Sequence, residues 1–201
     1  RAAVWKAVKS LQTDGYLISA VPNKGYRLLP ESDILSYAGI RLSLAPQYRD
    51  IPLDIRNLTG STNQDAKVLA VAGAAAGTVV IAESQTSGRG RLGRSFYSPA
   101  GTGLYLSVVL RPDLEFSDAV LITTAAAVAV ARAIESVTGL SPQIKWVNDL
   151  YLNGKKICGI LTEAVSDFES GTIESVIVGV GVNFRANSAL SEDLRAIVGA
   201  L

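Results

Sequence analysis

The sequence has no histidine, one cysteine and few charged residues, and each shortage excludes a class of protein. Without histidine, the usual zinc ligand sets and every histidine-dependent catalytic triad are absent. Cys158 alone cannot form an internal disulfide, and a single free thiol fits a reducing, cytoplasmic setting. Charged residues make up 18% and hydrophobic residues 48% of the 201 positions, a balance typical of a folded chain. Any chemistry therefore depends on Lys, Arg, Asp, Ser and backbone amides.

The most apolar segment, residues 119–131, is rich in alanine and is followed by Arg132. It is shorter than the roughly 20 apolar residues that a membrane-spanning helix needs, so we expect a buried helix and no contact with a membrane. The chain does not open with a basic segment followed by an apolar run, and no export signal is predicted.

Charge is distributed unevenly along the chain. Residues 1–30 carry five Lys or Arg and one Asp, whereas residues 31–201 carry 14 basic and 17 acidic side chains. The net charge of +1 therefore combines a basic N-terminal segment with a mildly acidic remainder. Such a segment favours an anionic partner.

Residues 1–31 are predicted to form a helix followed by a hairpin. Apolar side chains recur with helical spacing from Ala3 to Leu11, Asp14-Gly15 ends the helix, and a turn at residues 22–25 joins two short apolar runs. This order is typical of the end of a winged helix-turn-helix, whose recognition helix and wing both carry cations toward DNA. A small helix–hairpin cap with solvated lysines is the alternative. The candidate DNA-binding residues are Arg1, Lys6, Lys9 and Lys24.

The rest of the chain divides into a connection and a larger unit. Residues 32–54 carry no long periodic run and are predicted to include one short helix at 32–37. Residues 55–201 mix strands and helices without a regular βαβ repeat. We therefore expect an α+β fold for this unit, a mixed sheet backed by helices.

Two helices are predicted in the larger unit. The first runs from residue 61 or 62 to about 76 and ends before Gly77; the second begins at Ser117 as N-cap and ends at Gly139. Strands are expected at residues 78–82, 103–110, 143–147, 150–152, 155–163 and 172–180. Asn153-Gly154, between two of these strands, is a strong hairpin signal.

Residues 83–94 (ESQTSGRGRLGR) are the segment best suited to ligand binding. Its glycines let the backbone approach a ligand closely, and its three arginines can grip phosphate oxygens and offset the charge on departing pyrophosphate. It lacks the Gly-Lys-Ser/Thr ending of a Walker A loop, and although Gly88, Gly90 and Gly93 fit G-x-G-x-x-G, no helix is predicted after them. The alternatives are a solvated loop and an RG tract that binds nucleic acid. The second is disfavoured because the segment is short and lies between strands.

Six segments, taken together and in this order, resemble the catalytic domain of biotin protein ligases. They are STN at 61–63, Gln85, GRGRLGR at 88–94, KWVND at 145–149, KICGIL at 156–161 and GVGVN at 179–183. The helix and hairpin before them resemble the DNA-binding domain of the bifunctional members, which also repress the biotin operon. The likeness covers nearly the whole chain, and the arginine–glycine loop paired with KWxND is its most specific part.

The resemblance implies an ATP-dependent ligase of the cytoplasm. Biotin and MgATP would give biotinoyl-5′-AMP and pyrophosphate, and a lysine on the biotin carboxyl carrier domain of a carboxylase would then attack the mixed anhydride. Neither step requires an enzyme nucleophile, so positioning and charge stabilisation would supply catalysis. Operator DNA would be a second partner, and homodimerisation is left open.

The resemblance also implies roles for individual residues. The catalytic residues would be Lys156, Arg89, Arg91, Lys145 and Asp149. The biotin-binding residues would be Ser61, Thr62, Asn63, Gln85, Gly88, Arg89, Gly90, Arg91, Lys156, Gly159, Gly179 and Gly181. The residues that bind ATP or the adenylate would be Arg89, Arg91, Arg94, Phe96, Lys156 and Asn183. Asp149 would hold Mg²⁺ or orient the incoming amine.

Several of these assignments have plainer alternatives. Helix capping alone would explain Ser61, and Phe96 would either stack on adenine or belong to the core. Strict strand alternation places Lys156 and Gly159 on opposite faces, so Gly159 would reach biotin through its backbone or across a bulge. Gly179 and its neighbour Gly181 are expected to leave room for the apolar biotin tail.

The chain also departs from the family pattern. Phe96 stands where the family tends to have tryptophan and Val147 where it usually has proline. The first helices of the DNA-binding domain and the small C-terminal β domain are missing from residues 1–201, so we expect a fragment that binds biotin weakly. The rival readings are a lipoate or octanoate ligase, which would lack the Gly-Arg-Gly-Arg loop and usually carries histidine, and a biotin-sensing repressor without ligase activity.

Overall fold

The chain forms two compact units, Arg1–Asp50 and Ile51–Leu201. The computed structural model describes residues 2–113, 119–166, 173–187 and 190–201. Two predicted residues, the DNA contact Arg1 and the helix cap Ser117, lie outside the described ranges.

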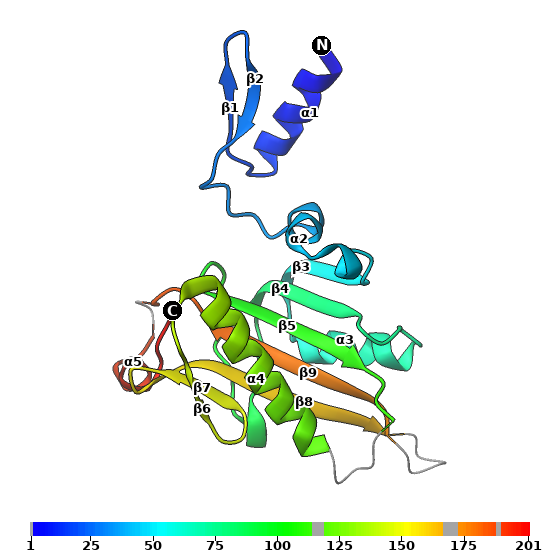
Figure 1. Ribbon diagram of the computed structural model, residues 1–201, viewed down its shortest axis with the longest axis vertical. Helices are drawn as coiled ribbons and strands as arrows, with labels where there is room; N and C mark the ends of the chain where they lie inside the picture. The colour runs from blue at the N-terminus through cyan, green and yellow to red at the C-terminus, as the bar shows by residue number, and fades with distance from the viewer. Residues whose placement is uncertain (1, 114–118, 167–172, 188–189) are drawn as a thin grey trace. The chain divides into compact units, whose positions relative to one another are not determined.

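The N-terminal unit begins with the predicted helix and hairpin (Figure 1). Helix α1 spans Ala2–Thr13, and strands β1 (Ile18–Val21) and β2 (Gly25–Leu28) pair in antiparallel fashion. Asn23 and Gly25 in the turn have φ angles of 58° and 103°, which asparagine and glycine tolerate best. Helix α1 buries none of its residues, and the predicted DNA contacts on it and in the turn are exposed: Lys6, Lys9 and Lys24.

The short helix predicted at residues 32–37 is wrong. The structure has helix α2 at Tyr37–Ser43, followed by the 3₁₀ turn η1 at Pro46–Tyr48. Ser36 is the N-cap of α2 because its hydroxyl accepts the backbone N–H of Gly39 at 3.1 Å. The Ser32 hydroxyl instead accepts the N–H of Leu17 in the same unit, and residues 32–36 are not helical.

The C-terminal unit is built on the mixed sheet that the sequence predicts. Its seven strands are β3 (Leu53–Thr59), β4 (Val79–Gln85), β5 (Gly103–Leu110), β9 (Ile173–Asn183), β8 (Lys155–Ser166), β7 (Asp149–Leu152) and β6 (Gln143–Lys145), in this order across the sheet. Strand β3 pairs with β4 in parallel, and every other pair is antiparallel. Strand β3 was not predicted, although Leu53 and Ile55 alternate with polar residues as in a half-buried strand, and its first two residues lie in the predicted connection 32–54.

Two helices cover opposite faces of this sheet (Figure 1). On β9, Ile177 packs in the cluster beneath α3, whereas its neighbours Val176 and Val178 pack in the cluster beneath α4. Because successive side chains of a strand point to opposite faces, the two clusters lie on opposite sides of the sheet. Helix α3 packs on β4, β5 and β9, and α4 packs on β6, β7 and β8.

Helix α3 is shorter than predicted. It spans Thr62–Val71 instead of reaching residue 76. Gly73 has a φ of +88°, its N–H donates to the Ala70 carbonyl, and the Ala74 N–H donates to the Leu69 carbonyl. This pair of bonds is a Schellman motif, which ends the helix one turn before the expected stop.

Helix α4 spans Ala119–Thr138 and ends before Gly139, as predicted. The prediction that it is buried, and too short to span a membrane, is wrong. Residues 120–138 are long and apolar enough for a span by length and composition, because the helix continues past Arg132. Among its side chains Ala127 and Ile134 are buried on the sheet, whereas Leu121 and Val137 are exposed. The helix therefore packs on the core with one face, to which four partly buried residues also contribute: Ile122, Ala126, Val130 and Ala131.

Candidate functional site

Most of the predicted site residues meet in one pocket of the C-terminal unit. It is lined by Ser61, Thr62, Asn63, Gln85, Arg89, Gly90, Arg91, Phe96, Asn148, Lys156, Gly159, Ile160, Leu161, Gly179, Val180 and Gly181. A larger groove shares Gln85, Phe96 and Lys156 with this pocket. The remaining predicted residues of this unit line the groove: Gly88, Arg94, Lys145, Asp149 and Asn183.

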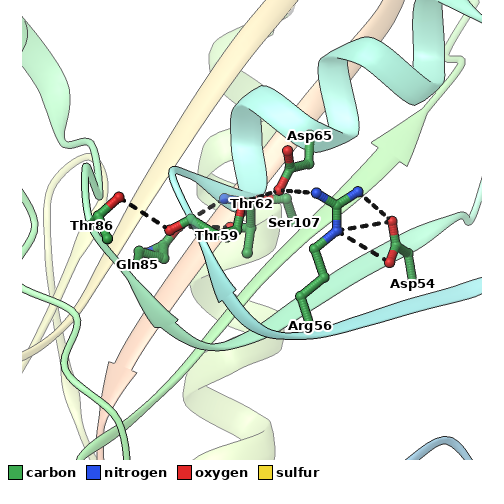
Figure 2. A network of polar contacts seen from close by, with 8 residues as sticks. All are labelled: Asp54, Arg56, Thr59, Thr62, Asp65, Gln85, Thr86 and Ser107. Atoms are coloured by element: carbon green, nitrogen blue, oxygen red, sulfur yellow. Dashed lines mark hydrogen bonds and ion pairs between the residues drawn. The ribbon is translucent and has the colours of Figure 1, made fainter.

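The first turn of α3 supplies the polar wall of the pocket (Figure 2). The Thr62 N–H and hydroxyl donate to Gln85 Oε1 at 2.9 and 3.1 Å. The buried Ser107 hydroxyl lies 2.8 Å from Thr62 Oγ1. Ser61 is the N-cap residue, but its side chain makes no capping hydrogen bond, so capping does not explain the choice of serine there.

The amide of Gln85 is held in one orientation. Its Nε2 donates to Ser98 Oγ at 2.8 Å, and the Ser98 hydroxyl donates to the Phe96 carbonyl at 2.9 Å. The Thr62 N–H at the other end can only donate, and the Phe96 carbonyl can only accept, so the direction of these bonds is fixed. The second Nε2 hydrogen of Gln85 makes no hydrogen bond to the described residues and is available to a ligand at the pocket wall.

The amide of Asn63 is also oriented by the protein. Its Nδ2 donates to Glu163 Oε2 at 2.8 Å and to the Leu161 carbonyl at 3.3 Å, and its Oδ1 accepts the Ser107 hydroxyl at 2.6 Å. Both amide hydrogens are therefore in use, and Asn63 can offer a ligand only its oxygen.

Three polar residues of the site were not predicted from the sequence: Ser107, Asn148 and Glu163. Ser107 is fully buried on β5 between the buried Tyr105 and Val109, and a hydroxyl on an otherwise apolar strand face is the signal that indicates it. Glu163 is indicated by no comparable pattern, because its partners come from distant parts of the chain.

The arginine–glycine loop reaches the pocket from two positions. Arg89 Nη1 lies 3.5 Å from Glu163 Oε1, and Arg91 Nη1 donates to Asn148 Oδ1 at 3.2 Å. Leu92, directly after Arg91, has a φ of 56° inside the short turn η2 (Arg91–Gly93), and the Gly90 N–H donates to the Arg94 carbonyl. Glu163 on β8 and Asn148 just before β7 thus hold the two guanidinium groups at the pocket.

Lys156 and Gly159 lie on the same side of β8, and strict alternation is the wrong expectation. The register shifts opposite Leu150 and Tyr151, so that Leu150 pairs with Cys158 and Tyr151 with Lys156. This bulge leaves one extra residue in β8, and a Cβ at Gly159 would lie 3.3 Å from Lys156 Nζ. The predicted alternative of a bulge therefore explains how both residues reach one pocket.

The space beside the β9 glycines is already occupied. A Cβ at Gly179 would overlap the Asn63 amide, and a Cβ at Gly181 would overlap the Phe96 ring. The expectation that these glycines leave room for an apolar tail is therefore wrong as stated, because they accommodate two side chains of the protein. Phe96 also contacts Tyr105 edge to face, with ring centroids 6.3 Å apart.

Comparison with known protein families identifies the family of this chain. The model of the biotin/lipoate A/B protein ligase family matches residues 57–183, which contain the whole pocket. The chain belongs to this family. Among solved structures, the biotin protein ligase of Aquifex aeolicus in complex with biotin and ATP is 30% identical to this chain, with a TM-score of 0.60 over 74% of this chain and 59% of that one.

Two curated relatives are both bifunctional ligase/repressor BirA proteins. That of Bacillus subtilis (strain 168) is 42% identical over 183 residues, which are 91% of this chain and 56% of the relative. That of Bacillus spizizenii is 41% identical over 188 residues, which are 94% of this chain and 57% of the relative. The chain therefore spans somewhat more than half the length of these relatives.

Proposed function

We propose that this family member is a biotin protein ligase. A carboxylate oxygen of biotin attacks the α-phosphorus of ATP and pyrophosphate leaves; the amine of an acceptor lysine then attacks the acyl carbon and AMP leaves. The observation that carries the proposal is a single pocket lined both by neutral polar side chains, at Thr62 and Gln85, and by cations, at Arg89, Arg91 and Lys156. We call these two sets of residues its polar end and its cationic end.

The polar end suits the ureido ring of biotin. That ring has one carbonyl acceptor and two N–H donors, and the wall offers both kinds of partner: the second Nε2 hydrogen of Gln85 as donor, and the oxygens of Thr62 and Asn63 as acceptors. A dithiolane ring or an alkyl chain would leave these buried groups unpaired. This favours biotin over lipoate or octanoate.

The cationic end suits a carboxylate and a phosphate brought together. Arg89, Arg91 and Lys156 surround the pocket, and Arg94 and Lys145 line the adjoining groove. Fixed cations reduce the repulsion between two anions and stabilise the charge that develops on the leaving pyrophosphate. The groove would take the nucleotide, and Phe96, at its junction with the pocket, would contact the adenosine.

Magnesium fits this site as a companion of ATP. Among the described residues no three His, Cys, Asp or Glu side chains cluster as a metal site, and Asp149 Oδ1 already lies 2.6 Å from the Lys156 ammonium. Mg²⁺ keeps several waters and is commonly held by substrate phosphates with one or two carboxylates. We therefore propose MgATP as the substrate, and Asp149 as the partner of Lys156 in place of a metal ligand.

The burial and protonation of the single cysteine also agree with catalysis by positioning, without an enzyme nucleophile. Cys158 is fully buried on β8, and burial raises the pKa of its thiol to about 12. A protonated, inaccessible thiol cannot form a thioester with the acyl group. The acyl group would pass directly from the adenylate to the lysine of a biotin carboxyl carrier domain.

Biotin-dependent exchange of pyrophosphate into ATP tests this function. Exchange with biotin and none with lipoate supports the proposal. Exchange that requires lipoate or octanoate would replace it with the rival ligase, and biotin binding without exchange would indicate a sensor that only represses. Transfer of label from biotin to an isolated carrier domain tests the second step.

A second role as an operator-binding repressor is favoured by the N-terminal unit. Its helix and hairpin expose Lys6, Lys9 and Lys24, and the two Bacillus relatives carry the name ligase/repressor. Phosphate contacts from such lysines make DNA affinity fall steeply with salt. Fluorescence anisotropy with operator-length duplexes at two salt concentrations, for the parent and for K9E/K24E, measures this contribution; a homodimer would appear in the same titration as a change in stoichiometry.

A further inference from the structure

A charged cluster connects strand β3 with helix α3 outside the pocket (Figure 2). It consists of Asp54 and Arg56 on β3 and Asp65 on α3. Asp65 lies in the first turn of α3, one turn after Thr62, and its side chain is 19% exposed. Its Oδ2 lies 2.9 Å from Arg56 Nη1 and accepts a hydrogen bond from the Thr59 hydroxyl. A single carboxylate thus connects the end of β3 to the beginning of α3.

Arg56 is itself held from the other side. Its Nη2 lies 2.8 Å and its Nε 3.2 Å from Asp54 Oδ2, a forked contact two residues earlier on β3. These carboxylates, with the Asp54 hydrogen bond foremost, raise the pKa of Arg56 above its ordinary value. The guanidinium is therefore fixed between two acids, of which only Asp65 belongs to α3.

The same cluster connects with the arginine–glycine loop. The Thr59 carbonyl accepts the backbone N–H of Thr86 at 2.9 Å, and the Gly60 carbonyl accepts the N–H of Ser87 at 2.8 Å. Thr86 directly follows Gln85, whose amide pairs with Thr62. The end of β3 therefore sets the position of both the helix turn and the first residues of the loop.

We propose that Asp65, clamped by Arg56, is a positioning residue for the polar end of the pocket. It fixes the rotation of the first turn of α3, and with it the direction of the Thr62 hydroxyl and N–H. Hydrogen bonds weaken steeply as their angle departs from linear, so a small rotation reduces recognition of the ureido ring. At the cationic end, Arg91 and Lys156 are held by Asn148 and Asp149, which Asp65 does not contact, so that end should change much less. This inference rests on the proposed function.

Equilibrium titration of biotin and, separately, of ATP into the full chain tests the clamp. D65N keeps an acceptor for the Thr59 hydroxyl and loses the ion pair. We expect it to weaken biotin binding at least fivefold and to change ATP binding less than twofold. The matched control is D54N, which also removes a carboxylate from Arg56 but leaves α3 untouched; we expect less than twofold change for either ligand.

A second pair of variants keeps the test decisive if D65N does not melt cooperatively. Arg56 is 36% exposed, so R56M is expected to fold, and it removes the cation from Asp65. We expect R56M to weaken biotin binding and R56K to restore it to within about threefold of the parent. Equal loss of biotin and ATP affinity, or D65N and R56M indistinguishable from D54N, would overturn the clamp. A parent chain that binds no biotin would overturn the proposed function, and the clamp with it.

Discussion

Lys156 Nζ lies 2.6 Å from Asp149 Oδ1, and Lys156 lines both the pocket and the groove. Asp149 Oδ1 is buried and accepts no aligned hydrogen bond from the residues that the structure describes, so the ammonium is its neutralising partner. We predict that Lys156→Met lowers biotin-dependent pyrophosphate exchange at least 100-fold, because the two substrate anions lose their shared cation. Chemical denaturation should show a loss of about 1–3 kcal/mol, because a buried carboxylate is left without its partner.

The double variant K156M/D149N separates the two effects. With the carboxylate neutralised, the free energy of unfolding should return toward that of the parent while exchange stays low. Recovery of exchange in the double variant would show that Lys156 acts only by holding Asp149 in the fold.

Gly181 is predicted to tolerate no side chain while Phe96 keeps its place. Gly181→Ala introduces a methyl group that overlaps the Phe96 ring, so the ring must leave its position between pocket and groove. We expect biotin affinity to fall at least tenfold in isothermal titration. Gly60→Ala is the control, since its Cβ would meet no atom within 4 Å. If the ring alone carries the effect, Phe96→Ala combined with Gly181→Ala should bind better than Gly181→Ala.

Much of the fold follows from short-range signals in the sequence. Gly139 ends α4, and Asn153-Gly154 joins β7 to β8 with φ angles of 51° and 77°, because these positions need backbone conformations that few residues adopt. The predicted positions of the start of α2 and the end of α3 are wrong, because similar short-range signals occur more than once near each of these helix ends. Several residues nearby carry capping signals, and tertiary bonds decide which are used, such as the Ser32 hydroxyl accepting the Leu17 N–H.

The site was predictable where a segment is chemically unusual and not where its function depends on packing. The alternation of arginine and glycine in residues 88–94 is visible in the sequence, whereas the bulge beside Lys156 is not, because register depends on the partner strand. Glu163 illustrates the same limit: it contacts Asn63, Lys67 and Arg89, which lie from 74 to 100 residues earlier.

Arg91 is predicted to matter for ligand retention and little for stability. It is exposed, and its one described side-chain hydrogen bond is to Asn148 at 3.2 Å. Arg91→Ala should accelerate release of a biotinoyl adenylate at least tenfold in a filter-binding chase and change the free energy of unfolding by less than about 0.5 kcal/mol. Arg132→Ala, an exposed arginine of α4 far along the chain, should change neither. A stability loss in Arg91→Ala that matched its loss of adenylate would argue for a structural arginine.

Cys158 should make the stability of the fold depend on alkaline pH. Burial, the largest cause, raises the pKa of its thiol from the ordinary 9.0 to about 12. Above pH 9 the unfolded chain releases this proton and the folded chain keeps it, so the unfolded state binds fewer protons. The free energy of unfolding therefore falls as pH rises from 9 to 12, by up to about 1.4 kcal/mol per pH unit. Cys158→Ala should lack this slope. Tyr105, whose pKa burial also raises, is present in both proteins and cancels in the difference. Urea denaturation of the two proteins at pH 8, 9.5 and 10.5 measures this difference in the pH dependence of stability. Parallel plots of the free energy of unfolding against pH would mean that the thiol ionises in the folded chain at its ordinary pKa.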